Sequence, residues 1–570
     1  MVRPADIKYW TEEEVCQFLK EEGLGEWEQT FKEKEITGDQ LLDLKKLKET
    51  VTDGGDYEKL REAIKKHMET YCSKVINDPI HGHMELHPLL VKIIDTAQFQ
   101  RLRNIKQLGG AYFVYPGASH NRFEHSIGVG YLAGELAKAL KSKQPELDIT
   151  DTDILCVQIA GLCHDLGHGP FSHLYDQMFI PRAFPNDDPQ WKHEKASVQM
   201  FNHMVETNNL QSSMELYGLN LQTDLKFIKE MIDPPKKTDL KQCKDEGPQK
   251  TDQERRSFLY EIVSNQITGI DVDKFDYFAR DCHHLGIKNN FDHMRFIKFA
   301  RVCEVDGKKH ICSRDKEVVN LYDMFATRHA LHRRAYQHKV TKNIELMITD
   351  AFLKADKHIQ IKGSGGKMFS LSQAKDDMEA YTKLTDQVME QILHSSSPEM
   401  EDARALLQRI LTRDLYFFVG EAKKKDPSKF TEDEIEGLKQ KLAEHTAEKD
   451  NFEVVQSKFD YGNGQEDPIE NAFFYTKGDH PRGFKINRNK SEHQQQQQKN
   501  VSMYLPSVFS ENFIRVYWKT KEDERRPHVV PVRESFHDWC EDKGFIATVG
   551  ETAQPEQASG GASGNNAGPN

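Results

Sequence analysis

The stretch GLCHDLGHGPFSH, residues 161–173, places three histidines and one aspartate within thirteen positions, and the apolar run ILCVQIAGLC (154–163) leads into them. Burying polar side chains costs free energy unless a partner satisfies them. The apolar run predicts a buried helix, and titratable side chains follow at its end. We therefore expect these side chains to form hydrogen bonds with one another or to hold a metal ion. His164 and His168 are four residues apart, so a helix would place them on one face, and Pro170 predicts that this helix ends soon afterwards.

A zinc-protease site is the first alternative, because it also uses two histidines at this spacing. That chemistry needs a glutamate directly after the first histidine as the general base. Here the residue is Asp165, and Gly167 and Gly169 disfavour a long regular helix. The sequence therefore favours another kind of metal site.

Two further segments supply ligands that would complete such a site. RFEHSIGVGYLAGELAKAL (122–140) carries His125 at the start of a helical pattern, and GIDVDKFDYFARD (269–281) carries Asp273. With His164 and Asp165 they give the order H…HD…D, and imidazoles with carboxylates suit Fe, Mn or Zn. The sequence therefore predicts one bound metal ion, against the alternative that the histidines are satisfied within an ordinary core.

Basic and aromatic residues gather near these ligands. A helix through 271–281 would present one metal ligand, two cations, a phenol and a second carboxylate within an arc of about 120°: Asp273, Lys274, Tyr277, Arg280 and Asp281. In RHALHRRAYQHK (328–339), Arg328, His332 and Tyr336 recur at i, i+4 and i+8. Arginine suits bidentate contact with phosphate, so beside a metal centre the two segments predict a polyphosphate-binding wall. Taken alone, the second segment would be interpreted as a solvated basic helix.

Composition limits the class of protein. The chain has 570 residues, 37% of them hydrophobic and 30% charged, and a formal net charge of −13. This balance argues against a globally basic nucleic-acid binder but not against local phosphate-binding clusters. No apolar run is long enough to span a membrane, the first residues carry no secretory signal, and nine scattered cysteines are typical of reduced thiols. We therefore expect an intracellular protein without a membrane segment.

The sequence resembles known families along most of its length. Residues 1–71 resemble a SAM (sterile alpha motif) domain through Trp10, GLGEW (23–27) and ITGDQLLDL (36–44), and the ligand order resembles the HD-domain metal phosphohydrolases. Longer runs, among them NDPIHGHMELHPLL, QLGGAYFVYPGASHNRFEHS and GIDVDKFDYFARDCHHLGI, extend the resemblance over residues 1–547. That whole stretch is similar to the vertebrate SAM- and HD-domain-containing deoxynucleoside triphosphate triphosphohydrolases.

We therefore expect a mainly α fold with an HD-domain helical core. The expected domains are a five-helix SAM-like domain (1–71), an HD domain with regulatory nucleotide sites (74–485), a smaller mixed α/β C-terminal lobe (486–547) with a poly-Gln loop at 493–499, and a disordered tail (548–570). CEVDGKKHIC (303–312) predicts a hairpin that turns at Asp306-Gly307, and the charged segment 421–450 predicts a solvated surface helix.

The resemblance implies that water cleaves a dNTP into a deoxynucleoside and inorganic triphosphate, with Mg²⁺ bound to the triphosphate. It implies an acid–base group in which His173 donates a proton to the leaving 5′-oxygen: His168, His173, Asp176 and His193. It implies phosphate contacts from Arg122, Lys274 and Arg328, and nucleoside contacts from Gln107, Tyr277, Asp281 and Gln337. Leu108 and Tyr336 would crowd the 2′ position and exclude ribonucleotides.

The resemblance also implies activation by nucleotides that assemble a homotetramer. The first site, for GTP or dGTP, would consist of Lys74, Val75, Asp95, Gln100 and Arg103, with Arg413 from a neighbouring subunit. The second site, for a dNTP, would consist of Asn77, Val114, Arg295, Arg314, Lys316, His338, Lys339 and Lys477. Further implied partners are single-stranded nucleic acid and a protein bound by the SAM domain. The activity would lower the dNTP pool and restrict retroviruses, an antiviral role.

The chain departs from the family pattern at several points. It lacks a basic nuclear-import stretch near the start and a Thr-Pro site in the tail, and Phe417 stands where lysine is frequent. The nucleus is nevertheless the expected compartment, with the cytoplasm as the alternative. Cys303 and Cys312 flank the predicted hairpin, and redox sensing by them competes with the interpretation as two reduced thiols.

Two rival functions remain open from the sequence. An HD-type phosphodiesterase or nuclease acting on RNA or single-stranded DNA would need an open basic groove with stacking aromatics, which a chain at −13 does not suggest. A non-catalytic nucleotide-sensing SAM scaffold would be expected to have lost at least one metal ligand, and all four are present.

Overall fold

The computed structural model describes residues 6–187, 189–235, 256–425, 428–446, 449–486 and 508–549. It divides into two compact units, each described by itself: Met1–Leu415 with Phe459–Ser510, and Tyr416–Lys458 with Glu511–Asn570. The poly-Gln run at 493–499 and residues 550–570 of the tail expected at 548–570 lie outside the described residues, whereas residues 548–549 end a strand, β12 (Ile546–Val549). The domain boundaries expected from the sequence therefore stay predictions.

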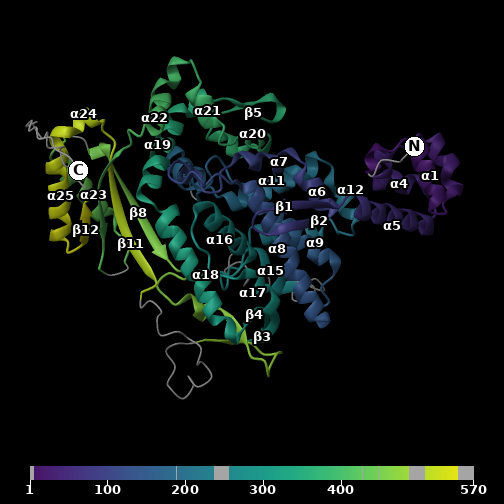
Figure 1. Cartoon of the computed structure of the whole chain (residues 1–570). Helices are drawn as coiled ribbons and strands as arrows, with labels where there is room; N and C mark the ends of the chain where they lie inside the picture. The colour runs from purple at the N-terminus through teal and green to yellow at the C-terminus, as the bar shows by residue number, and fades with distance from the viewer. Residues whose placement is uncertain are drawn as a thin grey trace, which may run out of the picture. The chain divides into compact units, whose positions relative to one another are not determined.

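The N-terminal residues form a small helical bundle, drawn in purple in Figure 1. Thr11 and Glu14 form a reciprocal capping box that starts the first helix. Trp10 is 2% exposed, and its ring packs edge-on against Phe18 and His67. The five-helix expectation is confirmed by α1 (Glu12–Glu21), α2 (Glu28–Glu33), α3 (Gly38–Leu41), α4 (Leu44–Thr50) and α5 (Gly54–Tyr71).

Two long helices, α8 (Arg122–Lys143) and α9 (Asp151–Cys163), form the centre of the HD core. Their backbones approach closely at glycines: a Cβ on Gly161 would lie 3.0 Å from the carbonyl oxygen of Val129. Every residue of α9 from Asp153 to Cys163 is buried, which explains its apolar sequence. A third helix, α16 (Val272–Leu285), packs on α8.

Further helices complete the mainly α core. Those before α16 are α6 (Pro88–Ile94), α7 (Ala97–Gln100), α10 (Ile180–Ala183), α11 (His193–Thr207), α12 (Leu210–Leu216), α13 (Thr223–Ile232) and α15 (Tyr260–Val263). Those after it are α17 (His293–Phe299), α18 (Val318–Leu331), α19 (Lys339–Ala355), α20 (Met378–Thr382), α21 (Val388–Leu393) and α22 (Glu401–Leu411). Among the helices that the structure describes, none has the length and apolar character needed to cross a membrane.

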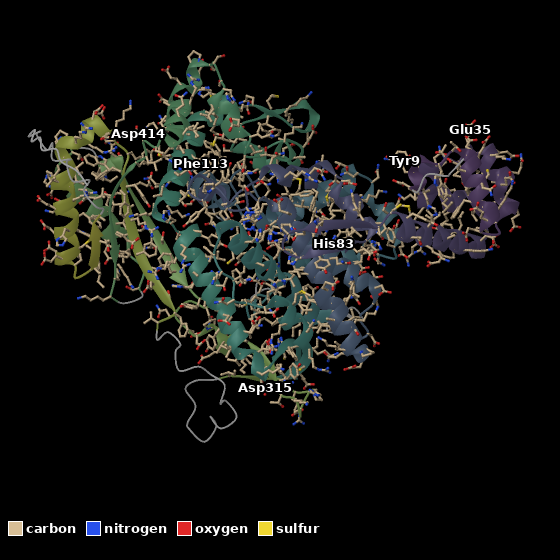
Figure 2. All side chains as sticks on the ribbon, viewed as in Figure 1. Tyr9, Glu35, His83, Phe113, Asp315 and Asp414 are labelled. Carbon is tan, nitrogen blue, oxygen red and sulfur yellow. The ribbon has the colours of Figure 1, made fainter. Side chains whose placement is uncertain are left out.

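The first unit also contains short β-sheets. Strands β1 (Lys74–Asp78) and β2 (Gly82–Leu86) form an antiparallel hairpin, on which His83 is exposed (Figure 2). A second sheet has the order β10-β9-β4-β3, made of Phe484–Lys485, Phe473–Tyr475, Lys308–Arg314 and Arg301–Val305. Its β3–β4 hairpin confirms the sequence prediction, because Cys303 pairs with His310 and the turn residues Asp306 and Gly307 have φ of 50° and 76°. Strands β5 (Ile361–Lys362) and β6 (Met368–Phe369) pair separately.

The second unit is mixed α/β. Its sheet has the order β12-β7-β11-β8, made of Ile546–Val549, Phe417–Lys423, Ser510–Trp518 and Phe452–Asp460, with β11 and β12 antiparallel to β7. It packs with α23 (Glu432–Ala443) and α25 (Val529–Asp542), and α24 (Glu522–Arg525) precedes α25 (Figure 1). The expected surface helix over 421–450 is only partly right: β7 continues to Lys423, and α23 buries Leu438 and Leu442 in the core.

Candidate metal centre and catalytic cleft

Three helices bring the predicted metal ligands together. His125 lies in the first turn of α8, His164 caps the end of α9, Asp165 follows it, and Asp273 lies in the first turn of α16. The prediction that His164 and His168 share a helical face is wrong, because α9 ends at Cys163 and the next residues form turns. This early end separates the two imidazoles into different groups.

The four side chains converge on one point. Nε2 of His125 lies 3.4 Å from a carboxylate oxygen of Asp165 and 3.2 Å from one of Asp273. Nε2 of His164 lies 3.3 Å and 3.4 Å from oxygens of the same two residues. Both Nε2 atoms are buried and make no hydrogen bond to the described residues. Two orphaned imidazole nitrogens facing two carboxylates fit a divalent transition metal, which accepts such N and O ligands.

The two histidine ligands are oriented by contacts to their Nδ1 atoms, on the side of each ring away from the carboxylates. Nδ1 of His125 lies 2.7 Å from a carboxylate oxygen of Asp276, and Nδ1 of His164 lies 2.7 Å from the carbonyl oxygen of Gly161. A proton on each Nδ1 leaves the Nε2 lone pairs free for a metal ion. Arg122 donates to Asp165 over 2.6 Å. Burial alone would raise the pKa of Asp165, but His164 and Arg122 hold it well below the usual range.

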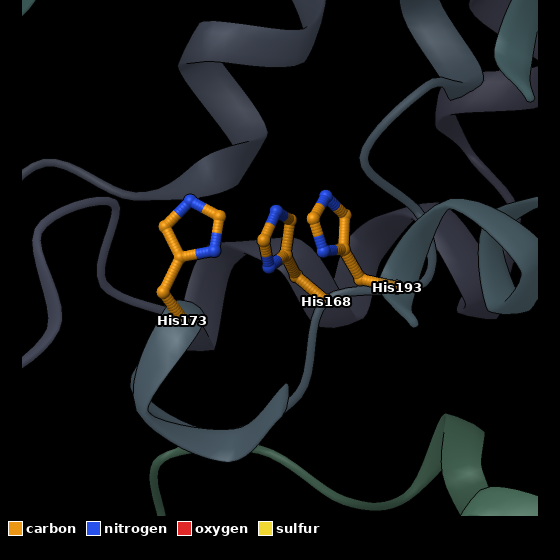
Figure 3. A group of neighbouring side chains, drawn as sticks. All are labelled: His168, His173 and His193. Carbon is orange, nitrogen blue, oxygen red and sulfur yellow. The ribbon is translucent and has the colours of Figure 1, made fainter. Parts of the chain in front are cut away.

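A second group contains three imidazoles. The rings of His168 and His193 are stacked, with centroids 3.9 Å apart, and His173 meets them edge-on (Figure 3). Asp176 lies 2.7 Å from Nδ1 of His193 and 3.5 Å from Nδ1 of His173. Since His168 Nε2 is 3.3 Å from Asp165, the two groups touch at that carboxylate.

Burial and charge separate the protonation states within this group. Burial, Arg122 and His193 all lower the pKa of His168, which is therefore neutral. Burial also opposes the charge on His193, but the carboxylate of Asp176 raises its pKa above the ordinary value. A neutral imidazole and a proton-holding imidazole thus lie face to face, which is the arrangement that acid–base chemistry requires.

The loop that carries His168 and His173 is fixed by the side chains of Arg101 and Asp386. Arg101 donates to the carbonyl oxygens of Leu166 and His168, each over 2.9 Å. Asp386 accepts from the backbone N–H of Phe171 over 2.6 Å, and burial raises the pKa of this carboxyl to about 7. Phe171 and the next residue have φ of 57° and 55°, a left-handed conformation that non-glycine residues adopt at a cost. A π-helical turn, Tyr175–Phe179, follows.

A cleft of about 390 Å³ opens beside both groups. It is lined by most of the residues predicted to contact substrate: Gln107, Leu108, Arg122, Tyr277, Asp281, Arg328, Tyr336 and Gln337. His168, His173, His193, Asp165 and Asp273 reach it too. A second π-helical turn, His332–Tyr336, forms part of the wall. Burial and Arg328 lower the pKa of His332 to about 3, so this imidazole is neutral.

Two cations predicted for the wall lie elsewhere. Lys274 does not line the cleft, and its Nζ pairs with both carboxylate oxygens of Asp271 at 3.0 and 3.1 Å. Arg280 is fully buried and pairs with Asp276 and Asp78. The face of α16 that lines the cleft therefore contains fewer residues than the sequence predicts. Lys274 and Arg280 form ion pairs with neighbouring carboxylates and do not line the cleft.

Several functional side chains were missed by the sequence analysis. Asp276, which supports His125, lies three residues after Asp273 on the same helix, and that spacing was the available signal. His120 contacts Asp281 at 2.6 Å, and Asp281 accepts from the Tyr336 hydroxyl at 2.5 Å. Ser172 binds Arg122 over 2.9 Å. Contacts of this kind join distant parts of the chain and leave no local pattern.

The residues predicted for activator binding lie mostly at the surface. Lys74, Val75 and Asn77 are exposed on β1, and Arg103 lies over the Phe123 ring at 3.6 Å. Arg295 and Lys316 both approach the Phe299 ring, which brings these two predicted residues together. Arg413, expected to act in a neighbouring subunit, donates to the carbonyl oxygen of Phe113 in its own chain.

The remaining predicted activator residues are also accounted for. Asp95, Gln100, Val114, Arg314, His338, Lys339 and Lys477 are exposed or half-buried. Phe417 starts β7 and packs edge-on against Trp518.

Comparison with known proteins agrees with this organisation. Residues 7–51 match the model of the SAM domain (sterile alpha motif), and residues 122–260 match the HD domain. The chain is similar to the zebrafish (Danio rerio) deoxynucleoside triphosphate triphosphohydrolase SAMHD1, 53% identical over 97% of this chain and 89% of the relative. It is 51% identical to the human (Homo sapiens) protein of that name over 95% and 86%, and 37% identical to the Dictyostelium discoideum homolog over 79% and 78%.

Proposed function

The chain belongs to the SAMHD1 family of deoxynucleoside triphosphate triphosphohydrolases, and we propose that its cleft is where a dNTP is cleaved into a deoxynucleoside and inorganic triphosphate. The observation that carries this proposal is the pair of imidazole nitrogens of His125 and His164 that make no hydrogen bond to the described part of the chain and face two carboxylates at the cleft. Because the chain belongs to this family of triphosphohydrolases, we set aside the two rival functions, a nuclease and a non-catalytic scaffold.

The metal ligands in this proposal are His125, His164, Asp165 and Asp273. When bound, a divalent ion supplies a Lewis acid that lowers the pKa of a coordinated water and polarises a phosphoryl oxygen. The ligand set suits Fe, Mn or Zn, and Mg²⁺ would accompany the triphosphate. Arg122 spans Asp165, Ser172 and the carbonyl oxygen of Gln107, so it fixes a ligand as well as lining the cleft.

Proton transfer to the leaving 5′-oxygen falls to the second group. His173 has the most exposed side chain of the group, 53%, and lines the cleft, so it can reach a substrate atom. Asp176 lies 3.5 Å from Nδ1 of His173 and 2.7 Å from Nδ1 of His193, and it raises the pKa of His193. His168 stays neutral beside Asp165. We therefore assign His173 as the proton donor, with Asp176 and His193 as its proton reservoir.

Substrate selection is assigned to two further residues that line the cleft. Tyr336 lines the cleft while its hydroxyl is held by Asp281, which fixes the ring. Leu108 lies at the same cleft. In our proposal these two side chains occupy the space that a 2′-hydroxyl would need. Arg328, half-buried near Asp460, contacts the phosphates.

The proposal extends to regulation. GTP or dGTP would bind at Lys74, Val75, Asp95, Gln100, Arg103 and Arg413, and a dNTP would bind at the second predicted site around Arg295 and Lys316. Ligands that bridge subunits stabilise the assembly that binds them, so a homotetramer is the proposed active form. The proposed compartment is the nucleus.

Product analysis tests the reaction and its switch together. The purified chain is incubated with dATP and Mg²⁺, with and without GTP, and triphosphate is separated from pyrophosphate and phosphate. We expect triphosphate and deoxyadenosine only when GTP is present. Triphosphate without GTP would retain the reaction and remove the guanine-nucleotide switch. Absence of product from metal-loaded protein in both cases would overturn the proposed function.

A further inference from the structure

A buried cluster of four charged or titratable side chains lies behind the metal ligand His125. It consists of Asp78, His81, Asp276 and Arg280, whose side chains are 4%, 2%, 0% and 0% exposed. Asp78 and His81 come from the β1–β2 hairpin, and Asp276 and Arg280 from α16. These segments are about 200 residues apart in sequence, and neither Asp78 nor His81 reaches the cleft.

Asp276 is the centre of the cluster because both of its oxygens are fully used. One oxygen faces Nδ1 of His125 at 2.7 Å and accepts from Nε of Arg280 at 2.9 Å. The other faces Nε2 of His81 at 2.7 Å and accepts from Arg280 at 2.9 Å. Each donor restrains the carboxylate in a different direction, so the Asp276 plane, and with it the His125 ring, has one orientation.

Asp78 links the cluster to the backbone of the hairpin. One of its oxygens accepts from Arg280 over 2.8 Å, and the other accepts from the N–H groups of Ile80 and His81 over 2.8 and 2.9 Å. The same carboxylate therefore shapes the turn that presents His81 and anchors the arginine that orients Asp276. The contacts form a closed ring: Asp78 binds Arg280, Arg280 binds Asp276, and Asp276 contacts His81. The N–H of His81 donates back to Asp78.

Helix α8 is shaped to admit this cluster. A Cβ on Gly128 would lie 1.9 Å from a carboxylate oxygen of Asp276 and 2.7 Å from a guanidinium nitrogen of Arg280. Gly128 is three residues after His125 on the same helix, so the glycine that makes room for the cluster adjoins the ligand that it supports.

We propose that His81 and Asp78 of the β1–β2 hairpin are positioning residues for the metal centre: through Asp276 and Arg280 they fix the ring of His125 and so set how firmly the protein retains its metal ion. Partners of a metal-bound imidazole typically change metal affinity by about 10- to 100-fold when removed. The hairpin thereby belongs functionally to a centre that it does not touch. This inference rests on the metal site of the proposed function.

The experiment measures metal retention instead of turnover. Full-length chain is loaded with Mn²⁺, transferred into excess EDTA, and the released Mn²⁺ is followed over time. We expect His81→Ala to release Mn²⁺ about 10-fold faster than the unmodified chain. His81→Gln keeps an N–H donor toward Asp276 and is expected to restore most of the retention. The matched control is His83→Ala, on the same hairpin but exposed, which should release at the unmodified rate.

A second variant tests the cluster from helix α8, which carries Gly128, and it has its own control. Gly128→Ala should also accelerate release, whereas Gly437→Ala, a helical glycine with open space around it, should not. Thermal unfolding is recorded for every variant, and if His81→Ala does not unfold cooperatively, Asp78→Asn takes its place. Release from His81→Ala or Asp78→Asn at the rate of the His83→Ala control would overturn the proposal. Failure of the unmodified chain to bind Mn²⁺ at all would instead contradict the metal site of the proposed function.

Discussion

The two histidine groups of the cleft use the same residue types and differ in where their nitrogen atoms point. In the metal centre, the Nε2 atoms of His125 and His164 are directed at two carboxylates and have no hydrogen-bond partner among the described residues. In the second group, His168 and His193 stack face to face, and Nδ1 of His193 is held by Asp176. The ring nitrogens of His168, His173 and His193 also lie within 4.8 Å of one another, so proximity alone does not distinguish the two groups. In the proposed function, the first group is the metal site and the second the proton-transfer site, a division that rests on the two carboxylates facing His125 and His164 and on Asp176 holding His193.

Breaking the first group should have the largest effect. His164→Ala or Asp165→Asn removes a ligand from the centre, so we expect turnover of dATP to fall to background together with loss of bound metal. Metal content by mass spectrometry and product formation are measured on the same sample. Normal activity in either variant would refute the ligand assignment.

Breaking the second group should lower turnover without releasing the metal. Asp176→Asn removes the charge that keeps a proton on His193, and general acid–base groups contribute about 10²- to 10⁴-fold. We expect a loss in that range with unchanged metal content. Gln177→Ala, beside His173 and in contact with it at 3.1 Å, is a milder neighbouring change for comparison. Loss of metal from Asp176→Asn would show that the two groups are one site.

A half-buried imidazole outside the cleft, His87, sharpens the comparison because the carboxylate printed nearest to it among the described residues, that of Glu69, lies 3.8 Å from its Nε2. Burial, Lys65 and Lys138 lower the pKa of His87 to about 4. Between pH 6.5 and about 4 the unfolded chain binds this proton and the folded chain does not, so stability falls as pH falls through that window. The contribution is at most about 3 kcal/mol.

The variant that tests this is His87→Asn. Asparagine can still cap α6, where Nδ1 of His87 now accepts from the N–H of Leu89, but it does not titrate. Denaturant unfolding across pH 4–7 should therefore give a flatter acid limb for the variant. An unchanged slope would mean that folding does not lower the pKa of His87.

The smallest expected effect concerns Tyr336, which lines the same cleft. Tyr336→Ala removes the ring that Asp281 holds at the cleft, so we expect discrimination between dATP and ATP to fall about tenfold, in line with the 1–3 kcal/mol typical of steric selection. Competition between the two nucleotides measures it. Tyr336→Phe, which keeps the ring, is the control and should retain most of the discrimination.

The sequence predicted this site well where ligands are local and poorly where they depend on packing. His164 and Asp165 are adjacent, and the hairpin turn Asp306-Gly307 demands its residues, so both could be predicted. The end of α9 at Cys163 and the withdrawal of Lys274 toward Asp271 depend on neighbours that no helical period reveals. The sequence predicted that Arg280 lies on this helix, but it also predicted that Arg280 faces the cleft, which is wrong. Arg280 instead pairs with Asp78, about 200 residues away, and no local pattern reveals that contact.

The close approach at Gly128 has a consequence for how related sequences can diverge. Any side chain at 128 would need the space now filled by Asp276 and Arg280, so substitutions at these three positions are expected to occur together or not at all. In a large alignment of this family, positions 128, 276 and 280 should therefore vary as a linked set, together with 78 and 81, while the exposed position 83 varies independently.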